Sequence, residues 1–187
     1  MKQIIPFAHD ILKESISEGD TVVDATLGNG HDSLFLSQLV GERGRVFSFD
    51  IQQEALDQSA LLFQEHNVNN VDMVLKGHEF ASDVLREKDI SSIEGVIFNL
   101  GYLPGSDKQI ATSSSTTIKA INQLFPLLEP QRYIVIVVYP GHSEGQAEKE
   151  ELMQFLSGIP AKEADIVKYQ MVNRSSGAPF AVALYKK

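Results

Sequence analysis

Short apolar runs alternate with amphipathic segments along nearly the whole chain. The runs are rich in β-branched and aromatic residues, as buried strands are, and they lie at residues 21–24, 45–50, 71–75, 95–100 and 133–139. Each run is followed by a segment with apolar residues at helical spacing, and one more such segment, residues 4–16, precedes them all. This alternation predicts a parallel sheet with helices on both of its faces.

Two further runs, residues 164–169 and 180–185, are joined by a loop at residues 173–179. Because no long helix separates them, we expect an antiparallel hairpin at one edge of the sheet. The whole pattern predicts an α/β, Rossmann-like fold with a seven-stranded, mostly parallel sheet and a C-terminal antiparallel hairpin. A chain of 187 residues can bury one full core, so we expect residues 1–187 to form a single domain.

A glycine turn follows the first predicted strand. Asp24 ends that strand, Gly28 and Gly30 form the turn, and Asp32 begins the next predicted helix. Glycine allows a positive φ and a close approach of ligand to backbone, and the free N–H groups at a helix start favour anionic ligands. These features predict a nucleotide-cofactor loop. The alternative is an ordinary strand-to-helix turn, which has the same G-x-G pattern.

The acidic residues around this turn indicate which cofactor it holds. Nicotinamide sites have the pattern G-x-G-x-x-G, whereas this chain has G-x-G alone, with Asp24 in front of it. A carboxylate there suits an ammonium group, such as the one at the methionine end of S-adenosylmethionine (SAM). Asp50 ends the second predicted strand, 20 residues after Gly30, where an acidic residue accepts hydrogen bonds from ribose hydroxyls. Ile51 and Gln52 come next, where an apolar side chain would cover the adenine; alternatively, Asp50 caps the following helix.

The segment after the third predicted strand begins at Gly77 and lies at the carboxyl edge of the sheet, where doubly wound folds bind ligands. His78 and Glu79 are candidates for hydrogen bonds to the adenine, and Phe80 is a candidate for packing against it. The alternative assigns Glu79 to the start of a helix, where an acidic side chain is favourable, and Phe80 to the core.

The fourth predicted strand ends in a polar residue, Asn99, followed by Leu100, Gly101 and Tyr102. An asparagine oxygen and a main-chain carbonyl can accept hydrogen bonds from an amine, and this orients the nitrogen lone pair for methyl transfer. Tyr102 adds an aromatic face for a nucleobase. The element resembles the (N/D)-P-P-(Y/F) motif of amino-methyltransferases, but Leu100 and Gly101 replace the two prolines. The alternative is a polar strand end with a tyrosine on its rim.

Methyl transfer to an alkyl amine also requires the amine to be neutral. With a pKa near that of lysine, on the order of one amine in a thousand is neutral at pH 7. The site must therefore desolvate the amine or remove its proton. The candidate bases are Asp107, Tyr139, His142 and Glu144, of which we select His142.

Composition excludes several classes of protein. The chain has no cysteine, so disulfides, thiol catalysis and cysteine metal sites are excluded, and we predict no metal. It has no membrane-spanning apolar run and no signal-peptide pattern, so we expect a cytoplasmic protein with no membrane partner. The net charge of −9 argues against a general nucleic-acid coat and motivates one alternative, a methyltransferase of a small metabolite. A second alternative is a non-enzymatic nucleotide-binding or interaction module, because a fold does not fix a function.

Five stretches resemble a small bacterial family labelled "putative rRNA methylase": residues 6–9, 24–32, 77–79, 99–105 and 139–142. The characterised members of this family are tRNA 5-(aminomethyl)-2-thiouridine methyltransferases. The resemblance therefore implies SAM as cofactor, the wobble uridine in the tRNA anticodon loop as substrate, a cytoplasmic location and a homodimer; the older label leaves rRNA as an alternative substrate. It also implies a SAM site lined by Asn29, Asp32, Asp50, Gln52, His78 and Glu79.

Overall fold

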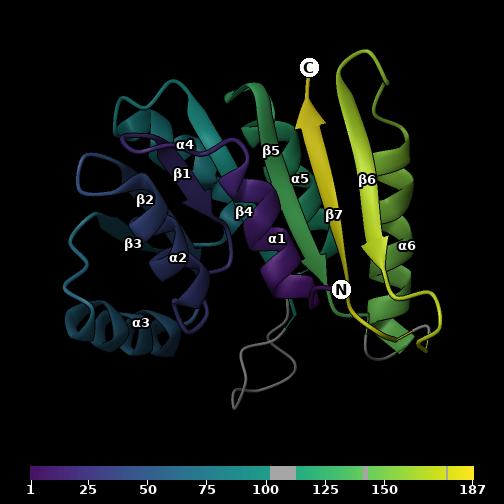
Figure 1. Cartoon of the computed structure of the whole chain (residues 1–187), viewed down its shortest axis with the longest axis horizontal. Coiled ribbons are helices and arrows are strands. Elements are labelled where there is room, and N and C mark those ends of the chain that lie inside the picture. Colours follow the sequence, from purple (N-terminus) through teal and green to yellow (C-terminus); the bar gives the residue numbers. More distant parts are fainter. Residues whose placement is uncertain (102–112, 141–142, 176) are drawn as a thin grey trace.

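The computed structural model describes residues 1–101, 113–140, 143–175 and 177–187, with 143–148 described as backbone only. Seven strands form one sheet in the order β3-β2-β1-β4-β5-β7-β6 (Figure 1). The strands are β1 (Thr21–Asp24), β2 (Arg45–Asp50), β3 (Val71–Leu75), β4 (Ile93–Leu100), β5 (Leu128–Val138), β6 (Ala164–Gln170) and β7 (Phe180–Lys186). All the pairings are parallel except those of β7, which is antiparallel to both β5 and β6.

Helices cover both faces of this sheet. They are α1 (Ile4–Lys13), α2 (His31–Val40), α3 (Gln53–Glu65), α4 (Ala81–Glu87), α5 (Ser114–Leu124) and α6 (Ser143–Ser157), with a short 3-10 turn, η1 (His78–Phe80), before α4. In Figure 1, α1 and α2 lie in front of the sheet and α5 lies behind it. The predicted α/β, Rossmann-like fold with its mostly parallel sheet and C-terminal antiparallel strands is confirmed.

The alternation of side chains along the strands divides the core into two clusters, one on each face. The first cluster joins α4, α5 and α6 to residues such as Val23, Val96 and Phe98. The second joins α1 and α2 to the neighbouring positions, among them Val22 and Ile97. Asp24, Ser48 and Asn99 have the same parity along their strands as Val22, Val46 and Ile97. Their side chains therefore belong to the face that α1 and α2 cover.

Several boundaries differ from the sequence predictions. The first helix ends at Lys13 rather than near residue 16, and β5 begins at Leu128 rather than near residue 133. The segment from 128 to 133 contains Pro130 and mostly exposed polar residues, so its pattern does not indicate a strand. In the part of the chain that the structure describes, each helix is too short or too polar to span a lipid bilayer.

Candidate active site

The glycine turn joins β1 to α2 and has the predicted left-handed backbone. Gly28 has φ of 51° and Gly30 has φ of 80°, and Gly30 is the N-cap of α2. A Cβ on Gly30 would lie only 2.7 Å from the hydroxyl of Ser59 in α3. The same hydroxyl donates a hydrogen bond of 3.1 Å to the carbonyl of Gly28. Gly30 is therefore required for close packing of the turn against α3, a reason that differs from the ligand approach expected from sequence.

Asp24 lies at the end of β1 and has no exposed surface. Its Oδ1 accepts a hydrogen bond from the main-chain N–H of Thr26 at 3.0 Å, and its Oδ2 accepts one from the Ser33 hydroxyl at 2.5 Å. Burial, reinforced by the charge of nearby Asp32, raises the pKa of Asp24 to about 7. The expected contact between Asp24 and an ammonium group stays a prediction, and in this structure the carboxylate has no surface to offer a ligand.

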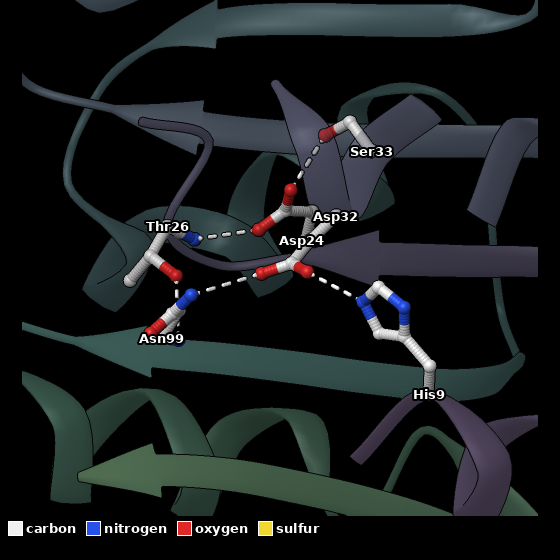
Figure 2. A network of polar contacts seen from close by, with 6 residues as sticks. All are labelled: His9, Asp24, Thr26, Asp32, Ser33 and Asn99. Atoms are coloured by element: carbon white, nitrogen blue, oxygen red, sulfur yellow. Dashed lines mark hydrogen bonds and ion pairs between the residues drawn. The ribbon is translucent and has the colours of Figure 1, made fainter. Parts of the chain in front are cut away.

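Asp32, in the first turn of α2, connects three elements of the fold (Figure 2). Its Oδ1 lies 2.6 Å from Nε2 of His9 in α1, and its Oδ2 accepts a hydrogen bond of 3.1 Å from Nδ2 of Asn99 at the end of β4. The Asp32 side chain is almost fully buried. A buried carboxylate with a hydrogen-bond donor at each oxygen is held in one orientation.

The contact with Asp32 also orients the amide of Asn99. A carboxylate only accepts hydrogen bonds, so the NH2 group of Asn99 must face Asp32 and its Oδ1 must point elsewhere. The main chain of Asn99 is fixed as well, because its N–H donates a hydrogen bond of 2.7 Å to the hydroxyl of Thr26. Asn99 is partly exposed at the carboxyl edge. Within the described part of the chain its amide oxygen has no donor, so it is available to accept a hydrogen bond from a ligand.

Asp50, at the end of β2, is partly exposed and holds the turn from the other side. Its Oδ2 accepts a hydrogen bond of 3.0 Å from the N–H of Gly28, and its Oδ1 accepts one of 3.0 Å from the N–H of Gln52. Each oxygen keeps a second lone pair. Two apolar side chains, Ile51 at 60% and Leu75 at 47% exposure, flank it, since Leu75 is the register partner of Asp50 on β3. An acceptor beside exposed apolar side chains suits a ribose that carries a base.

The three residues of η1 have different surroundings. His78 is buried, and its Nδ1 donates to the carbonyl of Ala25 at 3.0 Å. Burial lowers the pKa of His78, so the ring is neutral and its Nε2 is an acceptor, with no partner among the described residues. Glu79 is partly exposed, and Phe80 is 43% exposed under the ammonium of Lys119. Placing Phe80 in the core is therefore wrong.

Of the residues proposed for catalysis, the structure describes Asn99 and Tyr139 but not Tyr102 or His142, which lie outside the described residues. Asp107 lies outside them too, as does the side chain of Glu144. Tyr139 is 45% exposed at the end of β5, and partial burial, together with the charge of Asp32, raises its pKa. Its hydroxyl stays protonated at neutral pH, so Tyr139 is a hydrogen-bond donor there rather than a base.

Sequence reasoning missed His9, Ser33 and Ser48 as members of the site. His9 lies in the first predicted helix, and it belongs to one of the stretches that carry the family resemblance, but the helical pattern alone gives it no role. Ser48 is the register partner of Asp24, and its hydroxyl lies 2.7 Å from that of Ser33. A serine in the otherwise apolar run of β2 was the available signal for this buried polar cluster.

The sequence of this chain matches a known family. The family model described as "Putative rRNA methylase" matches residues 46–185. A tRNA (mnm5s2U34)-methyltransferase, chloroplastic, from Arabidopsis thaliana is 35% identical over 195 residues, which cover 100% of this chain and 70% of that protein.

Solved structures agree with these matches over the whole chain. A putative rRNA-methylase from Clostridium thermocellum has a TM-score of 0.93 at 38% identity, covering 100% of this chain and 99% of that one. A putative methyltransferase from Streptococcus mutans, in complex with SAH, has a TM-score of 0.89 at 31% identity, covering 100% of this chain and 99% of that one.

Fold and site thus define the class of the protein, a SAM-dependent methyltransferase. Within that class, the chain belongs to the family described as "Putative rRNA methylase". Two independent observations fit this cofactor: the carboxylate of Asp50 keeps a second lone pair on each oxygen beside apolar surface, and the buried Nε2 of His78 has no partner among the described residues.

Proposed function

We propose that this chain methylates the amine of a 5-aminomethyl group on 2-thiouridine at the wobble position of tRNA. One observation carries the proposal: Asp32 orients the Asn99 amide so that its oxygen, at the carboxyl edge of β4, has no donor among the described residues. The name of the Arabidopsis relative, a tRNA (mnm5s2U34)-methyltransferase, supports the substrate. The oxygen of an amide is suited to an amine, which has N–H groups to donate.

In this proposal, the residues around the glycine turn hold the cofactor, which supplies an electrophilic methyl group when bound. Asp50 accepts hydrogen bonds from the ribose, and Ile51 and Gln52 cover the adenine. His78 and Glu79 form hydrogen bonds with the adenine. Gly28, Asn29, Gly30 and Asp32 surround the methionine end. Asp24 supports this end indirectly through Thr26 and Ser33, because its carboxylate is fully buried and cannot contact the cofactor itself.

The acceptor side of the proposed site depends on Asn99. Its Oδ1 accepts a hydrogen bond from the amine, and the Leu100 carbonyl offers a second acceptor, although it already receives a 3.3 Å hydrogen bond from the N–H of Tyr139. Two acceptors aim the nitrogen lone pair away from themselves, toward the methyl group. Tyr102 as a stacking face for the base and His142 as the proton acceptor stay predictions, as do the homodimer and the cytoplasmic location.

Labelled SAM and tRNA carrying 5-aminomethyl-2-thiouridine test the proposal directly. We expect one methyl group on the exocyclic nitrogen of that nucleoside, identified by mass spectrometry, and none on tRNA that lacks the aminomethyl group. A protein that binds SAM but labels only rRNA or a small metabolite would overturn the tRNA assignment.

The role of Asn99 has its own test. Asn99→Ala should lower turnover by about a hundredfold, the loss typical of a single preorganised polar group, and leave SAM affinity within about threefold. Asn69 is an exposed asparagine in the turn before β3, at the opposite edge of the sheet. Asn69→Ala is the matched control and should retain full activity; full turnover in a folded Asn99→Ala variant would remove Asn99 from the mechanism.

A further inference from the structure

We infer that His9 is a positioning residue for methyl transfer, because its ring anchors the carboxylate that orients Asn99. The inference rests on the proposed function for its catalytic consequence, but its geometry is a property of the folded chain alone. Three side chains form the line His9–Asp32–Asn99, and they come from α1, α2 and β4 (Figure 2). His9 and Asn99 lie on opposite sides of Asp32 and contact different oxygens of its carboxylate.

The direction of each hydrogen bond follows from the chemistry of an ionised carboxylate. Both oxygens of Asp32 accept, so Nε2 of His9 must carry a hydrogen and the Asn99 amide must present its NH2 group. With two donors on opposite oxygens, the carboxylate cannot rotate without breaking a contact. Loss of the His9 donor frees one oxygen, and Asp32 can then turn and release the amide of Asn99.

His9 itself is held rigidly. Its ring stacks on Phe35 of α2, with the ring centroids 3.8 Å apart and the planes within 1° of each other. The apolar side of α1 is anchored by Ile4, Ala8 and Leu12, which are buried in the cluster that also includes β5 and β7 residues. A donor mounted on a packed helix costs little entropy to position, as a preorganised site requires.

In this arrangement α1 covers the sheet and also contributes a side chain to the candidate site. The helix precedes the first strand, and it packs against β5 and β7 rather than against the glycine turn. Through His9, however, α1 contacts Asp32, the carboxylate that holds the amide of Asn99 among the residues with described side chains. The position of α1 is therefore coupled to the acceptor side of the site, while Asp50 on the ribose side is bonded only to Gly28 and Gln52 among the contacts described.

Two substitutions of His9 distinguish the contribution of its hydrogen-bond donor from that of its stacked ring. His9→Phe keeps the stacked ring on Phe35 and removes the donor, and His9→Gln places an amide N–H close to the position of Nε2. We expect His9→Phe to lower kcat at least tenfold with SAM affinity within twofold of wild type. His9→Gln should recover most of that loss. His66→Gln, at an exposed histidine that ends α3, is the matched control and should behave as wild type.

A purely structural role for His9 predicts a different result. The His9→Phe variant would then melt at a lower temperature, but its turnover per folded molecule would equal that of wild type, and this outcome would overturn the proposal. A loss of kcat that His9→Gln does not restore would also overturn the proposal, because the hydrogen-bond donor of His9 would then not account for the loss.

A readout without substrate keeps this test separate from the test of the proposed function. The side-chain NH2 resonances of Asn99, followed by ¹H–¹⁵N NMR, report its contact with Asp32 directly. We expect them to shift in His9→Phe and to return toward their wild-type positions in His9→Gln. Unchanged resonances in His9→Phe would refute the coupling, whichever substrate the enzyme methylates.

Discussion

Asp24 and Asp50 end neighbouring strands and flank the same glycine turn, yet the fold places them in opposite environments. Asp24 is fully buried, and its hydrogen bonds come from Thr26 and Ser33 within its own strand-turn-helix unit. Asp50 is partly exposed, and it reaches across to the N–H of Gly28. Burial raises the pKa of Asp24 to about 7, so this group exchanges its proton near neutral pH.

The difference shows that a carboxylate at the carboxyl end of a strand is not necessarily accessible to a ligand. Asp24 is buried and accepts a hydrogen bond from Ser33 in the first turn of α2, whereas Asp50 is partly exposed and keeps a second lone pair on each oxygen. Asp32 is the carboxylate that contacts Asn99, the residue that we propose orients the amine. The following substitutions test this division.

The largest expected effect is on the pH dependence of stability at Asp24. Its pKa is 3.8 in a model peptide and about 7 in the fold, so the folded state keeps a proton that the unfolded chain releases. Stability from this group is present below pH 4 and is lost as pH rises through 7. Asp24→Asn does not titrate, so its unfolding free energy should rise relative to wild type by several kcal/mol between pH 4 and pH 8, at about 1.4 kcal/mol per pKa unit.

Thermal or denaturant unfolding of both proteins across that pH range measures the difference. Asn at position 24 can still accept from the Thr26 N–H and can donate to the Ser33 hydroxyl, so the contacts survive the change. Parallel stability curves for the two proteins would show that Asp24 is ionised in the fold at all these pH values.

The next effect is on SAM binding at Asp50. Asp50→Ala should weaken binding at least tenfold, because charge-assisted hydrogen bonds contribute roughly 1.5–3 kcal/mol. Isothermal calorimetry measures the affinity, and Asp57→Ala, at an exposed position of α3, is the control that should bind normally. Unchanged affinity in a folded Asp50→Ala variant would exclude Asp50 from the cofactor site.

A smaller effect is expected at Ser33, which links Asp24 to Ser48. Ser33→Ala removes the donor to Asp24 and leaves the hydroxyl of Ser48 without this partner, so it should destabilise the fold by about 1–2 kcal/mol. Denaturant unfolding measures the loss, and Ser91→Ala, at an exposed loop position, should cost nothing measurable. Equal stability of the two variants would mean that the buried cluster contributes little.

The smallest effect is expected at Ile51, beside Asp50. Ile51→Ala removes apolar surface that is 60% exposed in this structure and that the adenine would cover. We expect SAM affinity to fall roughly threefold, from burial worth about 25 cal/mol per Å2. Leu61→Ala is the control: Leu61 is an exposed apolar residue on α3, and its replacement should leave SAM binding unchanged. Equal affinities for both variants would place the adenine elsewhere.

The sequence alone determined the order of elements, the glycine turn and the polar residues that end the strands. These are local signals: apolar residues recur every second position in a strand and at intervals of three or four in a helix. The two C-terminal strands were predicted as an antiparallel hairpin for the same reason, and they form one. Asn99 was identified because a polar residue at the end of an apolar strand stands out in the sequence.

Only the tertiary structure decided which of these residues meet. His9 and Asp32 are 23 residues apart, Asp32 and Asn99 are 67 residues apart, and no local periodicity encodes either contact. The burial of Asp24, the fit of Gly30 against Ser59 and the exposure of Phe80 likewise depend on how α2, α3 and α5 pack. The physical reason is that periodicity reports the face on which a side chain lies, whereas packing between remote segments decides what covers that face.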